Sequence, residues 1–88
     1  MRIQVRRTGG FAGIERRSEV DTSDRPDAAE WQALAERALA TGRDTPPPGV
    51  PDGFAYEITV DGRTAYAADP QLSEEQRELI SRVLKEGA

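Results

Sequence analysis

Alternating apolar and polar positions predict four β-strands along the chain. Ile3 and Val5 alternate with polar or charged neighbours near the N-terminus, and a second strand is predicted over residues 11–20. The clearest alternation starts at Phe54 and ends at Val60, and a fourth stretch covers residues 63–68. Because successive side chains of a strand point to opposite faces, each stretch buries one face and leaves the other in water.

Three glycines separate the first two predicted strands or interrupt the second one. Gly9 and Gly10 fit a two-residue hairpin turn, whose primed geometry needs positive φ. Phe11 and Ile14 fall on opposite parities of the following strand, so a regular strand exposes one of them. A bulge at Gly13 would resolve that conflict, and we expect an early hairpin with a deformed second strand.

The second hairpin has a clear turn signal, because Asp61 and Gly62 suit a two-residue type I′ turn. That turn fixes the register of the flanking strands and places Tyr66 on the open face of the sheet, where an aromatic side chain could contact a partner. The predicted cross-strand pairs are Val60 with Arg63, Ile58 with Ala65 and Tyr56 with Ala67 toward the core, and Glu57 with Tyr66 on the open face.

Apolar residues at spacings of three and four predict two helices. The first begins between residues 24 and 28, with Pro26 in its first turn, and Gly42 follows its end. Asp27 and Glu30 form a possible capping box for it. Trp31 lies on the apolar stripe of this helix, so we assign its ring to the core.

The second helix has a stronger start signal. The hydroxyl of Ser73 and the side chain of Gln76 form a capping box, and Gly87 closes the helix. Its apolar stripe contains Leu72, Leu79, Ile80, Val83 and Leu84, and that of the first helix contains Ala28, Trp31, Leu34, Ala35, Ala38 and Leu39.

The order strand, strand, helix occurs twice, which predicts one α+β domain over residues 1–88 in the order ββαββα. Each helix has one apolar stripe to bury, so the economical arrangement is a four-stranded antiparallel sheet with both helices on one face. The opposite face then carries polar side chains that stay solvated or bind a partner, namely Arg2, Gln4, Arg6, Glu57, Thr59, Thr64 and Tyr66.

Four prolines between Arg43 and Gly53 exclude a helix or a central strand in that segment. The simplest interpretation is an extended crossover that returns the chain from the first helix to the sheet. The alternative is a stiff loop that presents a pre-organised surface to a partner.

The composition removes most catalytic chemistry. The 88 residues include no histidine and no cysteine, so neither a histidine-dependent triad nor an ordinary zinc site can form. We therefore expect no cofactor, no metal and no enzymatic activity. The N-terminus lacks the continuous apolar segment of a secretory signal or a membrane span, which favours a cytoplasmic protein with no membrane partner.

Charge is distributed unevenly along the chain. Residues 1–17 hold five arginines and one glutamate, whereas the net charge of the whole chain is −4. The basic first hairpin could dock an acidic partner, or it could simply balance the acidic helices. Because nucleic-acid binding depends on summed positive potential, a sequence pI near 4.8 argues against a nucleic-acid partner.

A family resemblance rests on three motifs. Arg7-Thr8-Gly9-Gly10-Phe11-Ala12-Gly13-Ile14, then Val20-Asp21-Thr22, then Phe54-Ala55-Tyr56-Glu57-Ile58-Thr59-Val60 resemble the emfourin family over residues 2–84. These are small bacterial proteins that inhibit thermolysin-like zinc metallopeptidases such as protealysin. The resemblance implies a ββαββα domain that acts as a reversible, cytoplasmic, competitive inhibitor of a co-produced peptidase, and the free protein is expected to be a monomer.

An inhibitor of this kind must place a rigid segment in the substrate cleft. Phe11 or Ile14 could fill a specificity pocket, although Phe11 could equally belong to the core and the glycines could serve turn geometry alone. Zinc could be contacted by Glu15, by Glu19 or by a backbone carbonyl, or not at all. The expected partner-binding residues are Thr8, Gly9, Gly10, Phe11, Ala12, Gly13, Ile14, Glu15 and Tyr66.

The alternative function is that of a non-catalytic adapter domain with another protein partner. Nothing in the residues names the partner, and a small rigid domain without cofactor chemistry serves either purpose. The emfourin resemblance favours the inhibitor.

Overall fold

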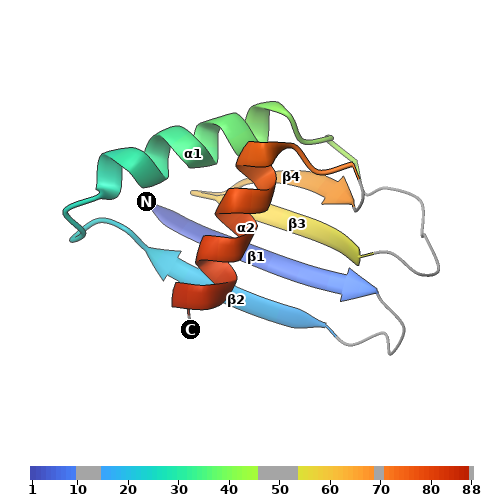
Figure 1. Cartoon of the computed structure of the whole chain (residues 1–88), viewed down its shortest axis with the longest axis horizontal. Coiled ribbons are helices and arrows are strands. Elements are labelled where there is room, and N and C mark those ends of the chain that lie inside the picture. Colours follow the sequence, from blue (N-terminus) through green and yellow to red (C-terminus); the bar gives the residue numbers. More distant parts are fainter. Residues whose placement is uncertain (10–14, 46–53, 69–70, 88) are drawn as a thin grey trace.

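The computed structural model of the chain describes residues 1–9, 15–45, 54–68 and 71–87. Its strands are β1 (Arg2–Gly9), β2 (Arg16–Asp21), β3 (Phe54–Val60) and β4 (Arg63–Ala68), and its helices are α1 (Ala28–Ala40) and α2 (Glu74–Glu86). The strands form one antiparallel sheet in the order β2-β1-β3-β4, and both helices lie on one face of it (Figure 1). The predicted α+β fold of order ββαββα is therefore confirmed.

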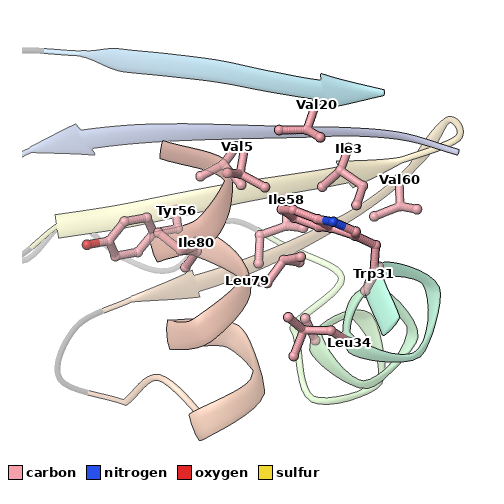
Figure 2. Close-up of a cluster of buried hydrophobic side chains, with 13 residues drawn as sticks. Ile3, Val5, Val20, Trp31, Leu34, Tyr56, Ile58, Val60, Leu79 and Ile80 are labelled. Carbon is pink, nitrogen blue, oxygen red and sulfur yellow. The ribbon is translucent and has the colours of Figure 1, made fainter. Parts of the chain in front are cut away.

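The hydrophobic core fills the space between the sheet and the two helices. Ile3, Val5 and Ile58 are fully buried, as their period-2 pattern predicts. Trp31 is fully buried as well, and Figure 2 shows its ring extending from α1 toward the sheet. The assignment of Trp31 to the core is confirmed.

The second hairpin has the predicted turn and register. Asp61 and Gly62 both adopt positive φ, 48° and 84°, as a type I′ turn requires. All four predicted cross-strand pairs are present. Ala65 and Ala67 are buried toward the helices, so the intervening Tyr66 lies on the opposite face, as expected.

The first hairpin does not have the predicted two-residue turn. The turn expected at Gly9 and Gly10 is wrong, because the register pairs Arg7 with Arg16 and leaves residues 8–15 between those paired positions. In the part of the chain that the structure describes, β2 accordingly begins at Arg16 rather than at residue 11.

The physical reason for this difference is the second neighbour of β1. Gly9 is the last residue of β1, where it pairs with Phe54 of β3 and adopts a φ of 96°. Pairing with β3 therefore prolongs β1 through the glycine that was expected to start a turn. The bulge predicted at Gly13 lies outside the described residues, as do Phe11 and Ile14.

Helix α1 begins at Ala28, inside the predicted interval, but the predicted capping box is wrong. Asp27 occupies the N-cap position without a side-chain capping hydrogen bond. Its Oδ2 instead accepts a hydrogen bond of 3.1 Å from the indole Nε1 of Trp31, which needs an acceptor because the ring is buried. Pro26 precedes the helix and does not occupy its first turn.

Gly42 directly follows the C-cap residue Thr41, as predicted. A Cβ added at Gly42 would lie 2.5 Å from the Cβ of Ala65, which is shorter than real contacts allow. The missing side chain therefore lets the end of α1 pass close over β4.

Helix α2 has the predicted capping box. The backbone N–H of Gln76 donates to Ser73 Oγ at 3.1 Å, and the backbone N–H of Ser73 donates to Gln76 Oε1 at 3.0 Å. Gln76 is also buried, and its Nε2 donates to the carbonyl of Ala38 near the end of α1 at 3.2 Å. One side chain thus caps α2 and fastens it to α1.

We expect Gln76→Ala to lower the free energy of unfolding by about 2 kcal/mol, because it removes a cap of α2 and the buried hydrogen bond from Gln76 to the carbonyl of Ala38. Gln32→Ala is the matched control, since Gln32 is exposed on α1 and should change stability by no more than about 0.5 kcal/mol. Urea denaturation followed by circular dichroism measures both. Equal effects would contradict the role assigned to Gln76.

Candidate functional site

One end of the sheet collects most of the described residues that flank the predicted binding segment. Register pairs Gly9 with Phe54, Thr8 with Ala55, and Ala55 with Ala68. The last residues of β1 and β4 and the first residues of β3 therefore meet at one end, where β2 also begins (Figure 1). We call this the loop end of the sheet, defined by Thr8, Gly9, Glu15, Arg16, Phe54, Ala55 and Ala68.

The structure describes four of the nine predicted partner-binding residues. Thr8 and Gly9 form the last part of β1, and both are half-buried. Glu15 lies just before β2, and Tyr66 lies on β4. The other five, residues 10–14, lie outside the described residues.

Glu15 is held by two arginines on the open face of the sheet. Arg6 approaches it with two nitrogen atoms, Nε at 3.1 Å from Oε1 and Nη2 at 3.2 Å from Oε2. Arg17 Nη2 donates to Oε1 at 2.8 Å. Arg6 also reaches Glu57 Oε2 on β3 with its Nη1, at 3.3 Å. The residue that precedes β2 is thereby linked to both β1 and β2.

This arginine pair changes the acidity of Glu15. The hydrogen bond from Arg6 is the largest cause that lowers the pKa of the Glu15 carboxyl, followed by the hydrogen bond from Arg17. Conversely, the hydrogen bond to Glu15 is the largest cause that raises the pKa of Arg6. Each group thus favours the charged form of the other.

Tyr66 lies on the same face as Glu15 but across the sheet from it. Register places Arg17, Arg6, Glu57 and Tyr66 in one row across the four strands. Three strand spacings separate the two ends of that row, about 14 Å. The structure therefore brings Thr8, Gly9 and Glu15 together at the loop end and leaves Tyr66 apart, near the outer edge of β4.

The backbone of Tyr66 pairs with Arg43, a contact that the sequence did not reveal. Arg43 N donates to the carbonyl of Tyr66, and Tyr66 N donates to the carbonyl of Arg43, both at 2.9 Å. The start of the predicted crossover therefore runs along the edge of β4. The proline-rich remainder of the crossover, residues 46–53, lies outside the described part of the chain.

Arg7 and Phe54 are neighbours of the predicted site that sequence reasoning did not select. The Cζ of Arg7 lies 4.5 Å from the centroid of the Phe54 ring, within the range of a cation–π interaction. Both residues continue the alternation of buried positions in their strands, Arg7 after Ile3 and Val5, so they lie on the helix side of the sheet. The alternation could have indicated that Arg7 lies on the helix side, but a charged residue is not expected at a buried position.

The described residues contain no group of three or more acidic, histidine or cysteine residues that could hold a metal ion. Neither of their helices is long and apolar enough to cross a membrane.

The emfourin family model matches residues 5–84 of the chain. The match includes α1, β2, β3, β4, most of α2 and the part of β1 that reaches the loop end of the sheet. Comparisons with curated proteins and with solved structures gave no match.

We expect Glu15 to titrate below its ordinary pKa of 4.5 in the folded protein. Because folding lowers this pKa, the contribution of Glu15 to stability is fully present above the unfolded pKa and is lost as the pH falls through the folded pKa. Carbon-detected NMR titration measures it. Arg6→Gln should raise the Glu15 pKa most, Arg17→Gln less, and Arg63→Gln not at all. An unshifted Glu15 in the parent protein would contradict the arginine contacts.

Proposed function

Because the chain belongs to the emfourin family, we propose that it is a reversible inhibitor of a thermolysin-like zinc metallopeptidase. The family membership favours a metallopeptidase-inhibitor role with a protein partner, and it is the observation that carries the proposal. We further propose that the chain is a single, non-enzymatic domain. It would work in the cytoplasm by blocking the substrate cleft of the peptidase.

The segment from Thr8 to Glu15 is the proposed contact with the cleft. Its two flanks are fixed in different ways, which supports this choice. Gly9 is held in the β1–β3 ladder by its pairing with Phe54, and Glu15 is held by Arg6 and Arg17. A segment whose ends are ordered before binding loses less conformational entropy when it docks.

Blocking the cleft without a carboxylate on the zinc is the mechanism that we favour. Glu15 already accepts hydrogen bonds from Arg6 and Arg17, and Glu19 lies 2.7 Å from Arg2 in an ion pair. Moving either carboxylate onto a metal ion would break these contacts. An apolar anchor, Phe11 or Ile14, then supplies the affinity by filling a specificity pocket.

Tyr66 is proposed as a second contact with the peptidase. It is half-buried on the open face, in the row that also contains Arg6 and Arg17. About 14 Å of polar sheet separates it from Arg17, which holds Glu15 at the other side of the sheet. A partner that covers a standard interface of about 800 Å² on this protein would span both positions.

We expect the purified protein to inhibit a thermolysin-like peptidase competitively, with substrate and inhibitor excluding each other. Phe11→Ala or Ile14→Ala should raise the inhibition constant at least about tenfold, because one of them removes the buried anchor. Gln32→Ala, at an exposed position of α1 away from the open face of the sheet, is the control and should inhibit like the parent protein. Circular dichroism confirms that each variant is folded. Undiminished peptide cleavage at a micromolar excess of the parent protein would overturn the proposed function.

A further inference from the structure

We propose that Arg7 receives a carboxylate side chain of the partner peptidase. The inference rests on the proposed inhibitor function and adds the chemistry that the partner must present at the loop end of the sheet. It depends on three observations: the ion-pair distribution among the arginines, the stacking of Arg7 on Phe54, and the local charge.

The first observation is that Arg7 differs from the other arginines of the first hairpin. Arg2 pairs with Glu19, Arg6 with Glu15 and Glu57, and Arg17 with Glu15. Arg16 donates its Nη2 to the carbonyl of Leu84 near the end of α2, at 3.0 Å. Arg7 has no ion pair with any acidic side chain in the described ranges.

The Nε atoms of Arg6 and Arg7 are both shielded from water and have no hydrogen-bond acceptor. Arg6 nevertheless has two carboxylates within ion-pair distance, whereas Arg7 has none in the described ranges. A charged donor that is kept from water without an acceptor is unfavourable, and it is relieved when an acceptor arrives. Arg7 as a whole is only half-buried, so a partner can still reach its guanidinium.

The second observation concerns the orientation of the guanidinium. Its carbon lies 4.5 Å from the centroid of the Phe54 ring, and the Phe54 ring lies 6.4 Å from that of Tyr56. An aromatic face beside a guanidinium restricts its plane and leaves its N–H edges for other acceptors. A carboxylate matches that edge with two parallel hydrogen bonds. Because Phe54 pairs with Gly9, this arrangement lies beside the proposed cleft-binding segment.

The third observation is the local charge. Arg7 and Arg16 are paired across β1 and β2, so two positive side chains lie next to each other at the loop end. Together with Arg6 and Arg17 they exceed the two nearby carboxylates, although the whole chain carries a net charge of −4. A long polyanion would be repelled by the acidic remainder of the chain, whereas one or two partner carboxylates would not.

The test compares inhibition constants of Arg7→Gln, Arg7→Met and Arg7→Lys with that of the parent protein. Losing a charge-assisted, two-point contact should raise the inhibition constant at least about tenfold in the Gln and Met variants. The inhibition constant of the Lys variant should lie between those of the parent and the Gln variant, because lysine keeps the charge but lacks the planar guanidinium. Arg63→Gln is the matched control, since it removes an equal charge from an exposed residue at the other end of β4, and it should stay within about twofold.

Salt dependence is the second measurement, and its first part uses the parent protein alone. Raising the ionic strength should raise the inhibition constant of the parent protein, and it should do so less for Arg7→Gln. The Met variant keeps an apolar stem against Phe54, so it remains informative if the Gln variant unfolds.

The outcomes separate the two proposals. Folded Arg7 variants that inhibit like the parent, or a parent inhibition constant that does not respond to salt, would overturn the role of Arg7 and leave the inhibitor function standing. A parent protein that fails to inhibit would overturn the inhibitor function, and the role of Arg7 with it.

Discussion

The pairing of β1 on both of its edges is the constraint on which the rest of the structure depends. β1 meets β2 through residues 2–7 and β3 through residues 3–9, so it joins the first hairpin to the second. The two ladders end at different places, and β1 therefore extends beyond β2 while β3 still supports it. That offset places Gly9 against Phe54 and separates it from the start of β2. The loop end of the sheet is a direct result.

Much of the fold could be predicted from sequence because its signals are local. The Asp61 and Gly62 turn fixes its own register within a few residues, and the Ser73 capping box needs only Gln76 three residues later. The prediction of the first hairpin turn was wrong because the interaction that decides it is not local. Its glycines looked like a turn, but the strand that prolongs β1 comes from a segment more than forty residues away.

At the N-terminus of α1, helix capping competes with the packing of the core for one side chain. Asp27 has the chemistry of a capping residue, yet its carboxylate goes to the indole of Trp31. Burying the largest side chain of the core leaves one N–H that water cannot reach, and the nearest acceptor satisfies it. Sequence spacing alone does not rank these two uses of one oxygen atom.

The candidate site was predictable in part. Tyr66 could be placed on the open face from the register of the second hairpin, but the arginines that hold Glu15 depend on the register of β1 with β2. The sequence did not indicate Arg7 because the alternation of Ile3 and Val5 is recognised by its apolar residues. A charged residue at the next alternate position suggests that the buried stretch has ended. Its stack on Phe54 needs contact between β1 and β3, which no local signal contains.

The two hydrogen bonds between Arg43 and Tyr66 also affect how the molecule can associate with copies of itself. Sheets that join side by side into an unlimited array need two free edges on every molecule. Here the main-chain groups of Tyr66, in the middle of β4, are already taken by a segment of the same chain. Such growth would be interrupted at this point of the β4 edge in every subunit.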